Sequence, residues 1–115
     1  MIGSDIITPA RYALSDSISP YRWGDDLMLL YLNKGIKEVR KHRADARMND
    51  EGDEDGGFTE LTAISETVPL RDEFESPLTD FLLARCFEND SDEKQDSEKA
   101  LYYDKRFYGK LGVAR

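Results

Sequence analysis

The chain has 115 residues, 39% of them hydrophobic, and a net charge of −8, a composition typical of one small domain with a modest core. No apolar run reaches membrane-spanning length and the N-terminus does not resemble a signal peptide, so we expect neither a membrane partner nor export. The single cysteine, Cys86, excludes an internal disulfide and a multi-cysteine zinc site, and its apolar neighbours predict a buried side chain.

Charge is distributed unevenly along the chain. Residues 1–43 hold seven Lys or Arg and five Asp or Glu, residues 44–98 hold four and eighteen, and residues 99–115 hold five and one. The ends are therefore mildly basic and the middle is strongly acidic. An acidic chain is a poor candidate for wrapping phosphate backbones, because affinity for them comes largely from Lys and Arg that displace counterions.

A short helix is expected over residues 4–14, which are rich in apolar side chains. Pro9 leaves two possibilities for its start: Thr8 caps a helix that begins at Pro9, or an earlier turn is kinked there. Residues 15–20 have turn chemistry. Trp23 follows, and we expect it to pack back on the core just before the next helix.

The strongest helical pattern begins after Gly24, an acceptable N-cap, with Asp25 and Asp26 in the first turn, where the positive end of the helix dipole favours carboxylates. Basic residues gather near its other end. Apolar residues recur with a period of 3.6 at Leu27, Met28, Leu30, Tyr31, Leu32, Ile36 and Val39. This stripe is wide enough for two neighbours, so we expect this helix to be the central element.

Residues 44–57 contain six carboxylates and three glycines, which favours a solvated acidic loop. A run of acids that ends at Gly56 resembles a calcium-binding loop. However, Glu51 and Thr62 stand at the first and twelfth positions, where such loops carry Asp and Glu. We therefore predict an acidic loop there. Residues 58–70 alternate loosely and break at Pro69, so they form at most a short β-hairpin.

A third helix is expected over residues 72–87, with Pro77 tolerated because it is early, and with apolar residues nearly all round, as in a sandwiched helix. Residues 88–98 hold six carboxylates and one lysine and are predicted to be a second acidic loop. A closing helix over residues 96–111 places Ala100, Tyr103, Phe107 and Leu111 on its core face. The fold class is therefore mainly α: one domain, 1–115, built as a small bundle of three to four helices.

No constellation of catalytic residues stands out. His42 and Cys86 are forty-four residues apart and lack flanking signatures, so we expect a solvated histidine and a structural cysteine. Walker-type, GxGxxG and HExxH motifs are absent from the sequence. We therefore predict that the protein is not an enzyme, with no catalytic, cofactor-binding or metal-binding residues.

Two pairs of adjacent carboxylates, Asp25-Asp26 and Asp72-Glu73, suggest acid/base work at first sight. Both pairs occupy predicted helix starts, where they stabilise the fold, and neighbours at i and i+1 do not face each other. A small metal-dependent nuclease or hydrolase would also need carboxylates on ordered elements. Here most of them fall outside the predicted helices, which disfavours that alternative.

The C-terminal segment 99–115 combines basic and aromatic residues beyond those that its core face needs. Tyr102, Arg106 and Tyr108 are left over, and Tyr and Arg are the residues that protein interfaces favour. With Lys110 and Arg115 they are the candidate partner-binding residues of the chain.

Two groups of motifs accompany these helices. The first comprises Arg22-Trp23-Gly24-Asp25-Asp26-Leu27, Leu30-Tyr31-Leu32-Asn33-Lys34-Gly35, Glu38-Val39 and Arg43-Ala44-Asp45-Ala46. The second comprises Val68-Pro69-Leu70-Arg71-Asp72-Glu73-Phe74, Pro77-Leu78-Thr79-Asp80-Phe81-Leu82-Leu83-Ala84-Arg85 and the closing stretch Lys99-Ala100 to Phe107-Tyr108-Gly109-Lys110-Leu111-Gly112. Together they resemble the head-to-tail adaptor (connector) proteins of tailed bacteriophages, and the second group is similar to that family's C-terminal helical pair.

The resemblance implies a structural virion protein of the neck, made in the host cytoplasm, that docks below the portal protein as a ring of about twelve copies. It implies that the ring extends the DNA channel and joins the portal to a tail or nozzle protein, with the C-terminal segment reaching the portal. Genomic DNA would pass without specific binding. The acidic stretches 44–57 and 88–98 are candidates for lining the channel or for meeting a basic patch on a partner.

A small helical DNA-binding regulator is the alternative. It would account for five basic residues on one predicted helix, Lys34, Lys37, Arg40, Lys41 and Arg43. It predicts salt-sensitive binding of the isolated protein to duplex DNA, against which the net charge of −8 argues.

Overall fold

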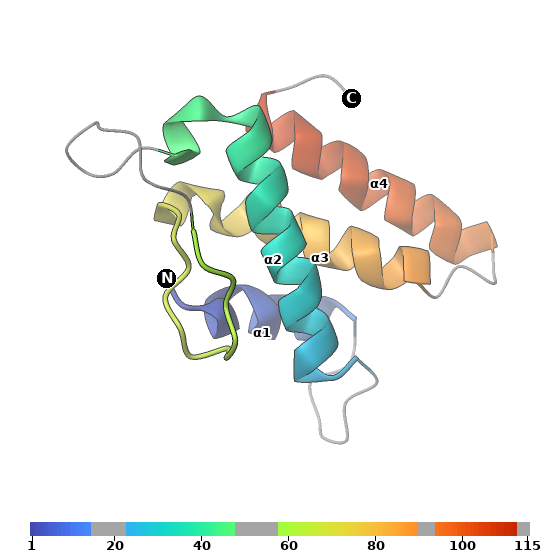
Figure 1. The fold of residues 1–115 in the computed structure, drawn as a ribbon. Coiled ribbons are helices and arrows are strands. Elements are labelled where there is room, and N and C mark those ends of the chain that lie inside the picture. The colour runs from blue at the N-terminus through green and yellow to red at the C-terminus, as the bar shows by residue number, and fades with distance from the viewer. Residues whose placement is uncertain (15–22, 48–57, 90–93, 113–115) are drawn as a thin grey trace.

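The computed structural model describes residues 1–14, 23–47, 58–89 and 94–112 (Figure 1). They form four α-helices and two short 3₁₀ helices. In chain order these are α1 (Gly3–Ala13), α2 (Asp25–His42), η1 (Ala44–Arg47), η2 (Asp72–Phe74), α3 (Glu75–Asn89) and α4 (Lys94–Leu111). No β-strand occurs in this described part of the chain, and the predicted mainly α bundle is confirmed.

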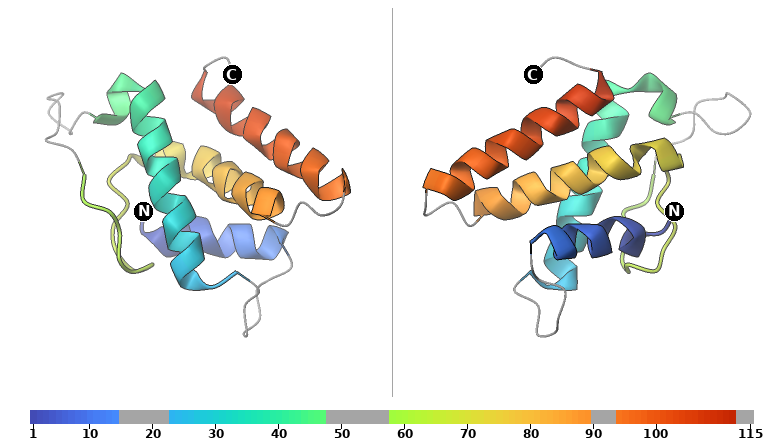
Figure 2. Two further views of the ribbon diagram at one scale, coloured as in Figure 1. Left: turned by 45° about the vertical axis from the view of Figure 1, so that its right-hand side comes forward. Right: turned by 180° about the vertical axis from the view of Figure 1, so that it is seen from behind.

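Helix α3 is the centre of the bundle. It packs along α4 and also contacts α1 and α2 (Figure 2). Its buried side chains lie on several sides of the helix, as expected for a sandwiched element. They are Pro77, Leu78, Asp80, Phe81, Leu82, Leu83, Ala84 and Cys86. The prediction that α2 is the central helix was therefore wrong. Helix α2 packs mainly on α3, with smaller contacts to η1 and α1, and leaves Leu30 exposed on its outer side.

The crossing of α2 over α3 is close because of a glycine. A Cβ atom at Gly35 would lie 2.9 Å from Cδ1 of Phe81 and 3.1 Å from Cδ2 of Leu78. Around this crossing the two helices bury Met28, Leu32, Ile36 and Val39 from α2 against Leu78, Leu82 and Cys86 from α3. Cys86 is fully buried, as predicted, with its Sγ 3.7 Å from Sδ of Met28.

Of the two possibilities weighed for Pro9, the structure has the one in which a helical turn precedes the proline. Helix α1 starts at Gly3 and continues through Pro9, so Thr8 is not its N-cap. Near its end the buried guanidinium of Arg11 donates to the carbonyl of Trp23 (2.6 Å) and to Oδ1 of Asp25 (2.7 Å). These bonds join α1 to the start of α2.

The sequence features expected at the start of α2 are present. Trp23 is buried, as predicted, and Gly24 is the N-cap. Asp25 and Asp26 occupy the first turn, where carboxylates face the unpaired N–H groups.

The segment 58–70 runs beside the N-terminus and forms no hairpin. The N–H of Gly3 donates to the carbonyl of Glu66 (3.0 Å), and the N–H of Ser4 donates to that of Ile64 (2.8 Å). A Cβ atom at Gly3 would lie 3.0 Å from the Ile64 carbonyl, so the glycine allows this approach. The polar backbone of the segment is thus satisfied by the N-terminal residues rather than by a second strand.

A side chain of α2 holds the other end of that segment. The amide of Asn33 donates to the carbonyl of Leu61 (3.0 Å) and accepts from its N–H (2.9 Å). Asn33 and Leu61 are both buried. The pair replaces the backbone partner that a hairpin would have supplied to Leu61.

The two predicted acidic loops differ from the sequence-based expectation. Of the first, residues 44–47 form η1, and residues 48–57, with most of the calcium-like run, lie outside the described residues. The second prediction, 88–98, was wrong at both ends: Glu88 and Asn89 complete α3, and α4 begins at Lys94. One acidic residue of this region, Asp96, lies in the first turn of α4, where a carboxylate faces unpaired N–H groups.

Candidate partner-binding surfaces

The outer side of α4 carries an ordered aromatic and cationic pair, Tyr102 and Arg106. Nη1 of Arg106 donates to the Tyr102 hydroxyl (2.9 Å), and the guanidinium carbon lies 5.5 Å from the Tyr102 ring centroid. This hydrogen bond, followed by the negative charge of Asp80, raises the pKa of Arg106 above its usual value. The Tyr102 ring is 53% exposed and meets the Tyr103 ring edge-on at 5.1 Å. An exposed aromatic side chain is therefore held in one position.

Lys110 lies one turn further along α4 and is directed at α3. Its Nζ lies 2.6 Å from Oδ2 of Asp80 and donates to Oγ of Ser76 (2.7 Å). Asp80 is only 4% exposed, and Nε of Arg106 approaches its other oxygen at 3.5 Å. Lys110 thus neutralises a buried carboxylate of α3.

Tyr108 faces α2 rather than solvent. Its hydroxyl donates to Oε2 of Glu38 (3.1 Å), and its ring lies 5.5 Å from the His42 ring at an interplanar angle of 86°. Burial, followed by the charge of Glu38, raises the pKa of Tyr108. His42, expected to be solvated, is half-buried, with Nε2 3.3 Å from the same Glu38 oxygen. Arg115, the last of the five predicted residues, lies outside the described residues.

The structure thus separates the predicted residues instead of gathering them. Tyr102 and Arg106 share the outer side of α4, Lys110 clamps α4 to α3, and Tyr108 joins α4 to α2. Sequence spacing places the first three on one helical stripe at i, i+4 and i+8. The partners of Lys110 and Tyr108 come from other helices, which local spacing does not indicate.

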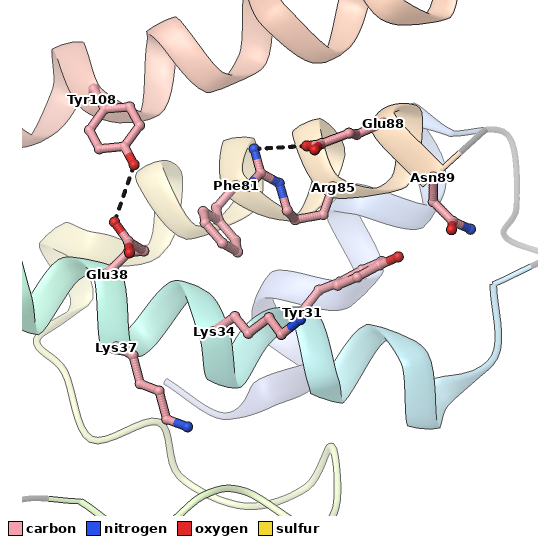
Figure 3. Close-up of a pocket in the computed structure, with 9 residues that line it drawn as sticks. All are labelled: Tyr31, Lys34, Lys37, Glu38, Phe81, Arg85, Glu88, Asn89 and Tyr108. Atoms are coloured by element: carbon pink, nitrogen blue, oxygen red, sulfur yellow. Dashed lines mark hydrogen bonds and ion pairs between the residues drawn. The ribbon is translucent and has the colours of Figure 1, made fainter. Parts of the chain in front are cut away.

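A cleft of about 630 Å³ opens between α2, α3 and α4 (Figure 3). Its lining combines three aromatic rings, basic and acidic side chains and one amide. The lining residues are Tyr31, Lys34, Lys37, Glu38, Phe81, Arg85, Glu88, Asn89 and Tyr108. Sequence reasoning assigned no site to this combination. The only local indication was that polar side chains recur along one side of α2, at Lys34, Lys37 and Glu38. That pattern does not predict a cleft unless the positions of α3 and α4 are known.

Arg85 lines the cleft and contacts side chains of both α3 and α4. Its Nη2 lies 2.9 Å from Oδ1 of Asp104 and 3.2 Å from Oε2 of Glu88, and its guanidinium carbon lies 4.9 Å from the Phe81 ring centroid. Sequence reasoning also missed Asp104, a buried carboxylate on the core side of α4. No sequence motif indicates this residue, because the cation that pairs with its carboxylate, Arg85, lies on another helix.

The five basic residues of the α2 region do not form a common face. Arg40 is buried, with its guanidinium carbon 5.4 Å from the Phe58 ring centroid, and Lys37 is ion-paired with Glu60. Arg43 donates to both oxygens of Asp45 (2.9 and 2.8 Å) and to the Leu111 carbonyl (3.1 Å). Lys34 and Lys41 remain exposed and, among the described residues, without an ion pair.

Within the described residues, no three His, Cys, Asp or Glu side chains come together as potential metal ligands. In the same part of the chain, no helix is long and apolar enough to span a membrane. No protein-family model matches the chain, and neither a curated protein nor a solved structure matches it significantly.

Proposed function

We propose that this protein is a head-to-tail adaptor of a tailed bacteriophage, a structural virion protein of the neck that forms a ring below the portal protein. The ring would extend the DNA channel, let genomic DNA pass without specific binding and connect the portal to a tail or nozzle protein. Two stretches of the sequence resemble this class. They become α2 and the α3–α4 pair, and the pair packs together, as a C-terminal helical pair should.

The single observation that carries the proposal is the exposed Tyr102 ring held by Arg106. A side chain that is already ordered loses little conformational entropy on binding, which favours its use as an anchor. Tyr and Arg are also the residue types that contribute most at protein interfaces. We assign this pair on α4 to the contact with the portal protein.

Ring formation requires two different surfaces on each copy, because contacts in a ring larger than a dimer are heterologous. Large apolar side chains are exposed on three separate helices: Tyr12 on α1, Leu30 on α2 and Leu101 on α4. These positions supply candidate patches for neighbouring copies in a ring of about twelve.

The acidic stretches 44–57 and 88–98 are proposed to line the channel or to meet a basic patch on a partner. Replacing their Asp and Glu residues with Asn and Gln tests this role separately. Assembly and DNA ejection that stay unchanged after both replacements would rule it out.

Native mass spectrometry of this protein mixed with the portal protein encoded beside it tests the proposal. We expect a stable complex with one adaptor per portal subunit. Tyr102→Ala should weaken the complex by about tenfold or more. Lys105→Ala, which truncates another exposed side chain of α4, is the control and should leave portal binding unchanged. Failure of the wild-type proteins to associate at any salt concentration would overturn the proposal.

No observation favours the alternative of a DNA-binding regulator. Its main argument was the group of basic residues on α2, and Lys37, Arg40 and Arg43 are engaged within the molecule. Binding of a short DNA duplex that weakens steeply with salt would nevertheless revive it.

A further inference from the structure

The outer side of α2 carries a row of three exposed side chains, Asp26, Leu30 and Lys34. They are four residues apart, so they follow one another along the helix surface. Leu30 is 49% exposed, a large fraction for a leucine in the middle of a helix. Helix α2 crosses one face of the layer that α1, α3 and α4 form, and no other described helix covers its outer side (Figure 1 and Figure 2). The row therefore belongs to the open surface of the molecule.

The two charges of this row have no internal partner. Among the residues that the structure describes, neither the Asp26 carboxylate nor the Lys34 ammonium has a hydrogen bond or an ion pair. Lys37, by contrast, is ion-paired with Glu60. The next residue of the row, Glu38, is turned toward α4, where it accepts from a tyrosine hydroxyl. The row thus consists of one free acid and one free base on either side of a leucine.

This arrangement is complementary to itself. Asp26 and Lys34 are each four residues from Leu30, one before it and one after it. If the same row of a second copy runs in the opposite direction, with the two leucines side by side, Asp26 of each copy lies beside Lys34 of the other. Rows of residues four apart interdigitate when two helices cross at about −50°, the commonest packing of helices in globular proteins. Two symmetric ion pairs would then flank one apolar contact.

The rest of the surface around α2 allows such a contact. The net charge of −8 opposes the approach of two copies. However, residues 1–43 hold seven Lys or Arg and five Asp or Glu, whereas residues 44–98 hold four and eighteen. Helix α2 therefore lies in a part of the chain where repulsion between copies is weak. Leu27 and Tyr31, both partly buried, form the adjacent row and add apolar surface.

We propose that the protein pairs with a second copy through this row, in an antiparallel contact between the two α2 helices. Leu30 packs on Leu30 of the other copy, and Asp26 pairs with Lys34 in both directions. Such an isologous contact closes with two copies, so it differs from the heterologous contacts of a ring. The inference concerns the free protein and does not rest on the proposed function. One helix crossing is smaller than a standard interface, so we expect a weak dimer in equilibrium with the monomer.

Sedimentation velocity of the full chain over a series of concentrations tests the pairing. We expect a monomer–dimer equilibrium that Leu30→Ala weakens by about tenfold or more. Leu101→Ala is the matched control, because Leu101 on α4 is also 49% exposed, and it should leave the equilibrium unchanged. A wild-type protein that stays monomeric up to about 1 mM would overturn the proposal. So would equal weakening by the two substitutions.

Charge reversal tests the two ion pairs. Asp26→Lys and Lys34→Glu each place like charges opposite one another in the dimer, and each should weaken self-association by about tenfold or more. Mixed in equal amounts, the two variants should associate with each other, because each then meets the opposite charge at both ends of the row. Failure of this mixture to associate, while the wild-type protein dimerises, would contradict the antiparallel pairing.

Lys41→Glu is the control for a change in net charge. Lys41 is exposed on the same helix but lies outside the row, so the variant should dimerise as the wild type does. A loss as large as that of Lys34→Glu would show that net charge, and not the pairing of Asp26 with Lys34, governs association, and the proposal would fail. Thermal melts confirm that every variant is folded.

Discussion

Arg85 on α3 and Asp104 on α4 form an ion pair across the main helical interface, with Nη2 2.9 Å from Oδ1. Asp104 is 3% exposed, so its charge is almost completely removed from water. Successive residues of a helix are about 100° apart, and this contact therefore fixes the rotation of α4. With Asp104 turned inward, Phe107 enters the core and Tyr102 remains on the outside.

Replacing Asp104 with Ala should destabilise the protein strongly. The substitution leaves the partly buried Arg85 without its main counter-charge, and breaking a buried pair in this way costs roughly 3 kcal/mol of unfolding free energy. Urea denaturation measures the loss. Glu88→Gln removes the exposed partner of the same arginine and should cost less than about 1 kcal/mol. Equal losses for the two variants would contradict the role given to Asp104.

Alanine should have opposite effects at two helical glycines. Gly35→Ala places a methyl group 2.9 Å from Phe81 Cδ1, and the overpacking should outweigh the better helix propensity, for a net loss of about 1 kcal/mol. Gly109→Ala meets no atom within 4 Å and should gain up to about 1 kcal/mol. Thermal melts of the two variants should shift in opposite directions. A stabilising Gly35→Ala would show that the α2–α3 crossing relaxes freely.

Asn33→Ala should release the segment that follows residue 57. The substitution removes both hydrogen bonds to Leu61 and leaves its buried N–H and carbonyl unsatisfied, at a cost of roughly 2–3 kcal/mol. Hydrogen exchange should accelerate at the Leu61 amide before global unfolding. Thr62→Val removes only the exposed hydrogen bond of the Thr62 hydroxyl to Glu66 and serves as the control. Unchanged protection of Leu61 in Asn33→Ala would refute this anchor.

The Arg43–Asp45 pair should make stability depend on pH at the acid end. The hydrogen bond from Arg43 is the largest cause that lowers the pKa of Asp45 in the folded protein. A lowered folded-state pKa stabilises the protein above the unfolded value of about 4, and the contribution is lost as the pH falls through the folded value. Solvent screens this part-exposed pair, so the contribution is less than about 1 kcal/mol.

Asp45→Asn tests that pH dependence directly. Urea denaturation should show the variant less stable than the wild type at pH 7, with the difference shrinking toward pH 2 as the wild-type carboxylate is protonated. A difference that stays constant from pH 7 to pH 2 would mean that the loss comes from packing or backbone geometry and not from the charge of Asp45.

Several elements were predictable because their signals are local. Gly24 with Asp25 and Asp26 marks the start of α2, and Pro77 is tolerated early in α3. The inward face of α4 was also predicted, since Ala100, Phe107 and Leu111 are buried. Helix α4 begins two residues before its predicted start at residue 96. The carboxylates of residues 88–98 were taken as a sign of a solvated loop, although acids also suit the first turn of a helix.

Within the candidate surfaces, the sequence identified exposed Tyr102 and Arg106 but assigned Lys110 and Tyr108 to the same role. Both of those side chains have internal partners, Asp80 for Lys110 and Glu38 for Tyr108. The cleft between α2, α3 and α4 was not predicted at all. Its lining comes from stretches of the chain that are up to about eighty residues apart, so no window of sequence contains it.

The sequence by itself determined that the protein is a small helical bundle and approximately where α2, α3 and α4 begin and end. Periodicity, caps and helix-dipole preferences act between residues a few positions apart, so they can be read without the fold. Only the tertiary structure decided that α3 takes the centre, that Arg85 meets Asp104 and that the segment after residue 57 pairs with the N-terminus. These outcomes depend on how whole helix faces and buried polar groups satisfy one another, and residues distant in the chain supply the partners.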